Sequence, residues 1–322
     1  MKRALVRAAL AIVASQLAVP AASWAAPLPH AATTTSQRTN VVTVVAAGDI
    51  ACGPNNSAFN GGLGAGSYCR AAAVDKVIQA INPDAVLPLG DEQYDAGRLR
   101  AFRRSYDKSW GKELYRSYPV PGNHEYYSSH RALGYFSYFG GRAGPNPRGW
   151  YTVRLGSWRL IALNSNCMYV GCRGGGAQFL WLRHLLQNHP SPCTLAYMHH
   201  PLVSSGPHGD DEMGARPLWK ALFHFGVDVA LVGHDHIYER FAPVNPDGAK
   251  DVLYGIREFV VGTGGAMHYP IDHVHRYSQV HNTTAFGVLQ LTLRPGAYDW
   301  RFRPAAGATF GDSGTARCHG AP

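Results

Sequence analysis

Short runs of apolar residues recur along the chain, and several end in a loop that carries Asp, Asn or His. Within each run the apolar residues occupy consecutive positions, whereas an amphipathic helix would space them at a period near about 3.6 residues. Consecutive apolar positions bounded by Gly or Pro are typical of strands that are buried on both faces of a sheet. We therefore predict buried strands over residues 41–47, 84–89, 118–120, 194–198 and 228–232.

Helical periodicity separates these runs at three places. The spacing of Ala, Val, Ile and Leu predicts helices over residues 70–81, 177–188 and 217–225. Pro83 follows the end of the first helix and Gly226 follows the third, and both residue types commonly terminate helices. Later apolar runs without polar loops predict further strands, over residues 259–263, 288–293 and 298–302.

The order of these elements indicates the fold class. Strands that alternate with helices and are then followed by strands in succession favour an α/β fold arranged as a layered sandwich. The chain shows no internal repeat of fixed period, and no linker rich in Pro and Ser occurs after residue 40. We therefore predict one folded domain over residues 41–322.

The N-terminal segment has the composition of an export signal. Residues 1–25 begin with basic side chains, continue with a short apolar run and end in small residues suited to cleavage after Ala25. An uncleaved anchor is the alternative, but the apolar run is shorter than the roughly 20 residues of a membrane-spanning helix. We expect a secreted or periplasmic protein with no stable membrane anchor. Residues 26–40 are expected to form a disordered linker.

Six cysteines are present, and an even number in an exported chain suggests disulfides. Six cysteines allow about 15 pairings, which the sequence alone does not distinguish. The chain contains no C-x-x-C pair, so a zinc knuckle is disfavoured. Two pairs would close Gly-rich loops, and the third would hold the C-terminal tail. We favour the pairs Cys52–Cys69, Cys167–Cys172 and Cys193–Cys318.

The formal net charge is +9, and the Lys and Arg residues are scattered along the chain. A basic surface attracts anionic substrates. Because the sequence has no dense cluster of Lys and Arg, the charge does not predict a nucleic acid as a partner.

Polar residues of a consistent chemical kind follow the five predicted buried strands. Ligands of α/β sheets gather at the carboxyl ends of the strands, so we expect these residues to lie close together. Carboxylates supply charge to neutralise two cations, and imidazoles bind Fe, Zn and Mn alike. Two cations about 3.5–4 Å apart can hold a hydroxide and bind a phosphoryl oxygen. The residues are Asp49, Asp91, Asn123, His199, His234 and His236.

The order and spacing of these residues resemble the calcineurin-like metallophosphoesterase superfamily. The matching motifs are Gly122-Asn123-His124-Glu125, Met198-His199-x-Pro201 and Gly233-His234-Asp235-His236-Ile237-Tyr238-Glu239-Arg240. Most members begin with Asp-x-His, but Ala51 stands where that His is expected. Tyr94 follows three residues after Asp91, where a phenolate can replace the imidazole. The missing His together with Tyr94 is similar to the purple acid phosphatase branch.

This resemblance implies an αββα sandwich and a role for each motif residue. Fe(III) is expected at the Tyr94 site, and a second ion, Fe(II), Zn(II) or Mn(II), is expected beside it. Asp91 would bridge the two ions, and His124 would contact the phosphate or act as an acid. The remaining assignments are Asp49, Tyr94 and His236 for the first ion, and Asn123, His199 and His234 for the second.

Several neighbouring residues admit a second interpretation. His200 adjoins His199, but the family pattern places the ligand two residues before Pro201 and so favours His199. His208 follows His199 at the spacing of a substrate-facing His in plant-type enzymes, and this match rests on spacing alone. Acidic residues inside the motifs are interpreted as groups that orient the ligands: Glu92, Glu125 and Asp235.

Three functions are compatible with the sequence. The first is an acid phosphomonoesterase that uses metal-bound hydroxide, with His124 and His208 as catalytic residues and a small phosphorylated molecule as substrate. The second is a phosphodiesterase on the same scaffold, acting on a nucleotide or a phospholipid headgroup. The third is a non-catalytic secreted binding protein, which is disfavoured because all seven ligand positions are occupied. The sequence predicts no oligomeric state.

Overall fold

A computed structural model of the chain describes residues 41–209 and 213–322. The signal peptide expected at residues 1–25 and the linker expected at residues 26–40 lie outside the described residues. No helix in the described ranges combines the length and the apolar character needed to cross a membrane.

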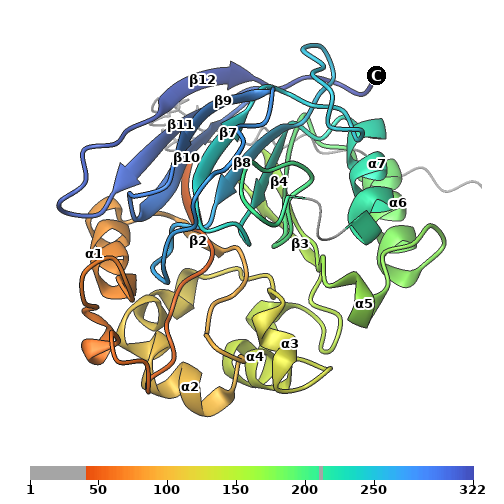
Figure 1. The fold of residues 1–322 in the computed structure, drawn as a ribbon. Coiled ribbons are helices and arrows are strands. Elements are labelled where there is room, and N and C mark those ends of the chain that lie inside the picture. Colours follow the sequence, from red (N-terminus) through yellow and green to blue (C-terminus); the bar gives the residue numbers. More distant parts are fainter. Residues whose placement is uncertain (1–40, 210–212) are drawn as a thin grey trace, which may run out of the picture. The chain divides into compact units, whose positions relative to one another are not determined.

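Two β-sheets lie at the centre of the fold (Figure 1). The strands of the first sheet are β1 (Val42–Ala47), β2 (Ala85–Pro88), β10 (Gly287–Arg294), β11 (Ala297–Pro304) and β12 (Ser313–Arg317). Those of the second are β3 (Tyr151–Leu155), β4 (Trp158–Ala162), β5 (Cys193–Tyr197), β6 (Val229–Val232), β7 (Tyr238–Phe241), β8 (Arg257–Val261) and β9 (Ser278–Asn282). The strand orders are β12-β11-β10-β1-β2 and β3-β4-β5-β6-β8-β7-β9.

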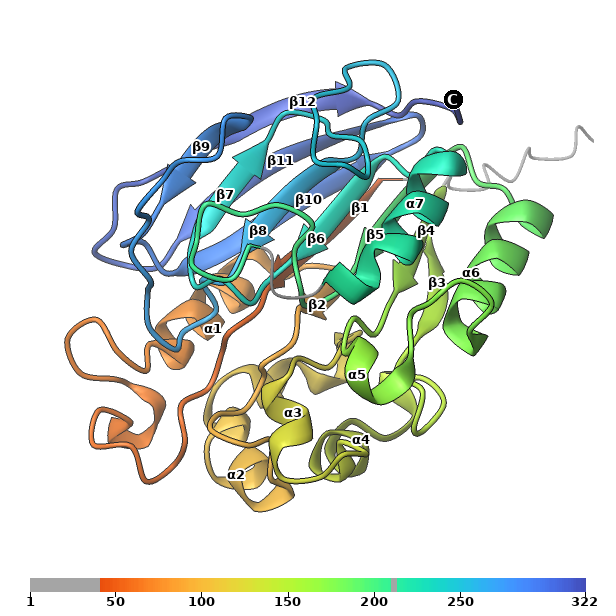
Figure 2. The same ribbon diagram turned by 45° about the vertical axis from the view of Figure 1, so that its right-hand side comes forward.

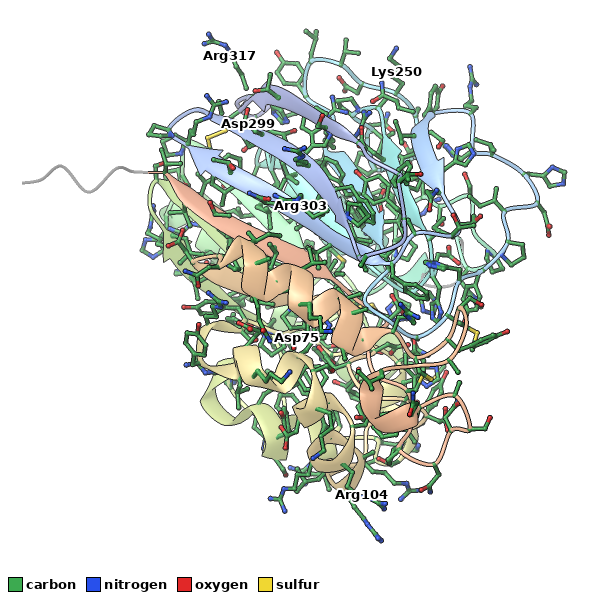
Figure 3. The ribbon with its side chains drawn as sticks, turned by 90° about the vertical axis from the view of Figure 1, so that its left-hand side faces the viewer. Asp75, Arg104, Lys250, Asp299, Arg303 and Arg317 are labelled. Carbon is green, nitrogen blue, oxygen red and sulfur yellow. A yellow bond between two sulfur atoms is a disulfide. The ribbon has the colours of Figure 1, made fainter. Side chains whose placement is uncertain are left out.

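Helices cover the outer faces of both sheets, and short helices also lie in the connections between strands (Figure 2). The α-helices are α1 (Ala71–Ile81), α2 (Leu99–Arg104), α3 (His124–Tyr127), α4 (Leu133–Phe139), α5 (Cys167–Val170), α6 (Ala177–Asn188) and α7 (Arg216–His224). Short 3-10 turns lie at η1 (Asn60–Gly62), η2 (Tyr106–Lys108), η3 (Trp110–Arg116), η4 (Gly140–Ala143) and η5 (Met213–Ala215). α1 packs against the first sheet (Figure 3), and α6 and α7 pack against the second (Figure 2). This arrangement confirms the predicted αββα sandwich.

The continuous apolar runs are explained by burial on both faces of the second sheet. On β5, Leu195 and Tyr197 pack into the core between the two sheets, whereas Ala196 packs toward α6 and α7. On β6, Leu231 packs into the core between the two sheets, and Ala230 packs toward α6 and α7. Side chains alternate between faces along a strand, so a strand covered on both faces needs apolar residues at every position.

The predicted helices correspond to α1, α6 and α7. In α1, Ala71, Val74 and Ile78 form the buried stripe expected from helical spacing. The helix ends at Asn82, which has a left-handed φ of 49°, and Pro83 then prevents its continuation.

Residues 118–120 do not form the strand that was predicted. They run beside β2, where the Tyr118 N–H donates to Val86 O at 2.8 Å and the Val120 N–H donates to Pro88 O at 3.1 Å. Because Pro119 lacks an N–H and another proline follows Val120, a regular ladder of hydrogen bonds cannot continue on this segment. The prediction of a strand here was wrong, although the segment runs beside β2.

The three predicted disulfides are present. Cys52–Cys69 and Cys167–Cys172 close loops, and Cys193–Cys318 joins the start of β5 to the C-terminal segment. All six cysteines are therefore paired, which leaves no thiol for a metal site.

Candidate metal centre

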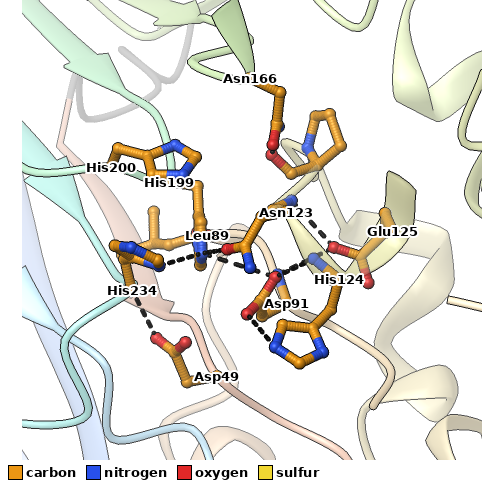
Figure 4. Close-up of polar contacts among 12 residues, drawn as sticks. Asp49, Leu89, Asp91, Asn123, His124, Glu125, Asn166, His199, His200 and His234 are labelled. Carbon is orange, nitrogen blue, oxygen red and sulfur yellow. Dashed lines mark hydrogen bonds and ion pairs between the residues drawn. The ribbon is translucent and has the colours of Figure 1, made fainter. Parts of the chain in front are cut away.

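The loops that follow β1, β2, β5 and β6 carry six of the seven predicted metal ligands, and Asn123 follows the segment at residues 118–120 that runs beside β2. β1 and β2 are parallel in the first sheet, and β4, β5, β6 and β8 are parallel in the second. Their carboxyl ends therefore meet at one edge of the sandwich, where ligands of α/β sheets bind. Residues as distant in sequence as Asp49 and His234 come into direct contact there (Figure 4).

Three of the converging residues have a backbone conformation that is uncommon for residues with a side chain. The φ angles of Asp49, Asp91 and His234 are 61°, 49° and 72°. Hydrogen bonds hold this conformation: the Asp49 N–H donates to Gly90 O at 3.0 Å, and the His234 N–H donates to Asp49 Oδ2 at 3.0 Å. Strained backbone of this kind concentrates at functional sites, where it aims side chains that a regular turn could not.

One group of side chains surrounds the Tyr94 hydroxyl. This oxygen lies 3.0 Å from Asp49 Oδ1, 3.1 Å from Asp91 Oδ2 and 2.9 Å from His236 Nε2. His236 Nε2 is also 3.3 Å from Asp49 Oδ1. The side chains of Asp49, Tyr94 and His236, predicted to hold the first ion, are thus brought together.

A second group surrounds His199 Nε2. This nitrogen lies 3.0 Å from Asn123 Oδ1, 3.2 Å from His234 Nδ1 and 3.5 Å from Asp91 Oδ1. Asp91 thus presents Oδ2 to the first group and Oδ1 to the second, which is the position of a bridging carboxylate. Figure 4 shows these side chains facing a common space.

Hydrogen bonds to the backbone fix which imidazole nitrogen faces the site. The His199 Nδ1–H donates to Leu89 O at 2.8 Å, and the His236 Nδ1–H donates to Met267 O at 3.1 Å. In both rings Nε2 is therefore the nitrogen that faces the carboxylates, as in metal-binding histidines.

The donor atoms of the two groups have the chemistry of a metal site. The Asn123 amide donates its N–H to the Tyr127 hydroxyl at 2.6 Å, so its oxygen faces His199 Nε2. Carboxylate, phenol, imidazole and amide oxygen donors that are gathered in this way suit Fe, Zn or Mn, so the donor set fits metal ions.

Charges in the cluster shift the pKa values of its members. Burial opposes ionisation, but the imidazoles of His199 and His124 hold the pKa of Asp91 well below its usual range. Burial also opposes charge on His199, but Asp91 raises the pKa of its imidazole to about 9. Burial, Asp49 and Asp91 raise the pKa of the Tyr94 phenol well above its usual value. Loss of the phenolic proton would therefore require a strongly charged cation.

A cleft of about 310 Å³ opens onto the two groups, and both predicted catalytic histidines line it. The His124 Nδ1–H donates to Asp95 O at 2.7 Å, and Nε2 lies 3.7 Å from Asp91 Oδ2. The His208 ring lies 4.8 Å from the His234 ring. The cleft is lined by Asp91, Asn123, His124, Tyr127, His200, His208, His234, His236 and Tyr269.

Three lining residues were not predicted as part of the site. His200, interpreted from the sequence as a residue that supports the ligands or packs beside them, faces the cleft and lies with Nδ1 2.8 Å from Ser165 Oγ. Tyr127 supports Asn123, and its place one helical turn later was an available signal. Tyr269 stacks on His236 with ring centres 4.0 Å apart, and no motif marks it in the sequence.

Two of the three acidic residues inside the motifs, Glu125 and Asp235, brace the ligand loops, as predicted for orienting groups. The buried Glu125 carboxylate accepts the N–H groups of Asp91, Gln93 and Gly122 at 2.9, 3.1 and 2.8 Å. Asp235 accepts the His208 N–H at 3.1 Å.

The third acidic residue, Glu92, forms no hydrogen bond to a ligand loop in the described part of the chain, so the orienting role predicted for it was wrong. Its fully buried carboxyl lies beside Glu125, and burial and Glu125 raise its pKa well above the usual value. Burial and Asp91 raise the pKa of Glu125 to about 7.

Comparison with known sequences identifies one family over most of the fold. The calcineurin-like phosphoesterase family matches residues 41–238. Uncharacterized proteins from two strains of Mycobacterium tuberculosis are 29% identical to this chain over 201 residues, which are 54% of this chain. The matched part covers only 38% of the length of these curated relatives.

Solved structures with a similar fold come from diverse proteins. The purple acid phosphatase from yellow lupin seeds (Lupinus luteus) aligns with a TM-score of 0.68 and 19% identity, over 88% of this chain and 55% of the lupin chain. PhoD aligns at 0.59 and 12% identity, over 87% and 70% of the two chains. GAP50, an inner membrane complex anchor of Plasmodium, aligns at 0.58 and 13% identity, over 88% and 90%.

The sequence match spans the loops of both ligand groups, and the structural matches extend over both sheets. The lupin enzyme agrees with the resemblance that Ala51 and Tyr94 suggest. We conclude that the chain belongs to the calcineurin-like phosphoesterase family and has the fold of a purple acid phosphatase.

Proposed function

We propose that the chain is an exported acid phosphomonoesterase of the purple acid phosphatase type, with a dinuclear metal centre. The observation that carries this proposal is the position of Asp91. Its two carboxylate oxygens contact different groups of donor atoms, one around Tyr94 and one around His199. Export is supported by the composition of residues 1–25 and by the three disulfides, which persist in oxidising compartments.

Each donor group suits a different ion. Asp49, Tyr94 and His236 would hold Fe(III), because a phenolate and a carboxylate favour a hard, highly charged cation. Asn123, His199 and His234 would hold Fe(II), Zn(II) or Mn(II), with Asp91 shared between the two ions. Two bound cations would supply the charge that lowers the pKa of water and neutralises phosphoryl oxygens.

The side chains at the mouth of the cleft determine what the site can bind and protonate. His124 reaches Asp91 from the Asp95 side, and His208 lies beside His234. A phosphoryl group between them would contact an imidazole on each side, and either imidazole can transfer a proton to the leaving alkoxide. Imidazole contacts on both sides suit the dianion of a monoester better than the monoanion of a diester.

The test is a comparison of two substrates with one purified protein. The wild-type protein should hydrolyse p-nitrophenyl phosphate faster than bis(p-nitrophenyl) phosphate at acid pH. Asp91→Asn should reduce monoester turnover by at least about 100-fold, because it weakens the contact shared by both donor groups. Asp299→Asn, a matched change at a half-exposed position on β11, should retain wild-type turnover.

Two outcomes would contradict the proposal. Faster turnover of the diester would assign the chain to the phosphodiesterases of the same scaffold. No turnover of either ester by the metal-loaded protein would indicate the non-catalytic binding protein.

A further inference from the structure

A second cleft, of about 620 Å³, adjoins the metal centre through Tyr94. The Tyr94 hydroxyl belongs to the first donor group, while the same residue also lines this second cleft. The other lining residues come from the loop after Cys52 and from the segment that leads into α2. They are Gly53, Pro54, Asn55, Asn56, Asp95, Ala96, Arg98, Arg100, Ala101 and Arg104.

The lining of this cleft is basic. Arg98, Arg100 and Arg104 contribute three guanidinium groups, against the single carboxylate of Asp95. Within the described part of the chain, none of the three arginines forms an ion pair. Arg104 projects outward from the end of α2 (Figure 3). Three like charges in one cleft repel each other and attract an anion.

Buried polar groups hold the two walls of the cleft in place. Gln93 Nε2 lies 3.1 Å from Ala51 O, 3.1 Å from Cys52 O and 2.7 Å from Tyr94 O. From the other wall of the cleft, the Ser105 hydroxyl donates a hydrogen bond to Cys52 O at a distance of 2.6 Å. Gln93 and Ser105 are almost fully buried, so the cleft is formed before any ligand arrives. A preformed site avoids the entropic cost of ordering loops on binding.

We propose that this cleft, which we name the basic cleft, binds a phosphate-type oxyanion. Guanidinium groups present planar pairs of N–H donors that match tetrahedral oxyanions, and they stay charged at every working pH. The anion has two sources: the second phosphate group of a substrate whose first phosphate occupies the metal centre, or free inorganic phosphate. Binding in the basic cleft does not depend on the phosphatase activity proposed above.

The test measures how many equivalents of inorganic phosphate bind to the metal-loaded protein, by isothermal titration calorimetry. Wild-type protein should bind one phosphate at the metal centre and one in the basic cleft. The triple variant Arg98→Gln, Arg100→Gln, Arg104→Gln should lose the second event or weaken it at least about tenfold. Arg103→Gln, which removes the same charge from α2 outside the cleft lining, should bind as the wild type does.

Asp91→Asn separates this proposal from the proposed function. Phosphate binding that persists in Asp91→Asn and disappears in the arginine variant supports the basic cleft, whatever the metal centre does. Equal stoichiometry and affinity in the wild type and the arginine variant would overturn it. If the triple variant does not fold, as judged by thermal unfolding, Arg104→Gln alone should still weaken the second event.

Kinetics distinguishes the two sources of the anion. If the second phosphate of a substrate is the ligand, the arginine variant should raise the KM for a bisphosphate several-fold relative to the KM for a monophosphate ester. If free phosphate is the ligand, that ratio should stay constant while phosphate binding is still lost. Both results support an oxyanion site, and an unchanged ratio together with unchanged phosphate binding contradicts it.

Discussion

The side chain of Ala51 cannot bind a metal ion, and Tyr94 supplies a donor atom in the same part of the site. Ala51 is buried, and its side chain offers no donor atom. Ala51 pairs with Gln93 in an isolated parallel β-bridge. The next residue, Tyr94, places its hydroxyl within 3.0 Å of Asp49 and 2.9 Å of His236. A phenol therefore lies among the donors of the first group, where other family members use an imidazole.

Tyr94→Phe tests the assignment of iron to this position. A tyrosinate bound to Fe(III) gives a visible charge-transfer absorption, so the wild type should be coloured and the variant colourless. Tyr115→Phe, at an exposed tyrosine, is the matched control and should keep the colour. The visible spectrum and the iron content measure both. A colourless, iron-free and fully active wild type would leave a Zn- or Mn-type enzyme.

Glu258 predicts a pH dependence of stability away from the metal centre. Burial raises its pKa from 4.5 to about 8, although the carboxylate accepts the Leu202 N–H at 2.8 Å. The folded chain therefore binds more protons than the unfolded chain between pH 4.5 and about 8. Stability from this residue is present below pH 4.5 and is lost as the pH rises toward 8.

Glu258→Gln should remove that dependence, because Gln keeps the acceptor for Leu202 but does not ionise. Relative to the wild type, the variant should gain about 4 kcal/mol in free energy of unfolding between acid pH and pH 8. Denaturant unfolding at several pH values measures this difference. Parallel pH profiles for the two proteins would show that Glu258 does not carry the raised pKa.

At the level of elements, the sequence predicted several strands that are buried on both faces and the helices α1, α6 and α7, each of which buries one face. β1, β2, β5, β6 and β8 were found because their apolar residues run without interruption. β10 and β11, in which apolar residues alternate with polar ones, were also predicted. β3, β4 and β7 were not predicted, although β4 is buried at every position. β9 and β12 were missed because they are edge strands with alternate residues exposed and few apolar side chains. Such strands are specified by pairing with neighbours, which a local pattern does not report.

The candidate site was predicted more completely than the strands. All seven predicted ligands converge. Each belongs to a motif, and six of them follow the carboxyl end of a buried strand, whereas Asn123 follows the irregular segment at residues 118–120. Tyr269 was missed for the opposite reason. It reaches His236 through a loop after β8, and only the folded chain brings that loop to the cleft.

Gly122 tests how tightly the loop after β2 and the loop before α3 fit together. A Cβ on Gly122 would collide with the Asp91 carboxylate and backbone nitrogen. Gly122→Ala should therefore displace Asp91 and reduce turnover by about 100-fold. Gly141→Ala, where a Cβ would meet no atom within 4 Å, should leave turnover unchanged. Wild-type kinetics for Gly122→Ala would show that the position of Asp91 is not critical.

At the level of the molecule, the C-terminal segment is tied to the second sheet at two points. Cys318 is bonded to Cys193, and the His319 N–H donates to Asp228 Oδ1 at 2.7 Å. Asp228 also accepts the Thr194 N–H at 2.8 Å, so the tail is held where β5 and β6 begin. This end of the sheet is opposite to the metal centre.

The disulfides should contribute unequally to stability. Cys193 and Cys318 are 125 residues apart, whereas Cys167 and Cys172 are 5 apart. A longer closed loop restricts the unfolded chain more. Replacing both cysteines of the long loop by Ala should reduce the free energy of unfolding by about 2–4 kcal/mol, and more than the same change in the short loop. Equal losses in denaturant unfolding would contradict this ranking.

The metal content of the purified protein tests the central claim most directly. If Asp91 is shared by two ions, elemental analysis should find two metal ions per wild-type chain and at most one in Asp91→Asn. Asp299→Asn should retain both ions, because this half-exposed residue of β11 pairs with Arg294 of β10 and belongs to neither donor group. Full phosphatase activity in wild-type protein that contains no metal would contradict the dinuclear centre.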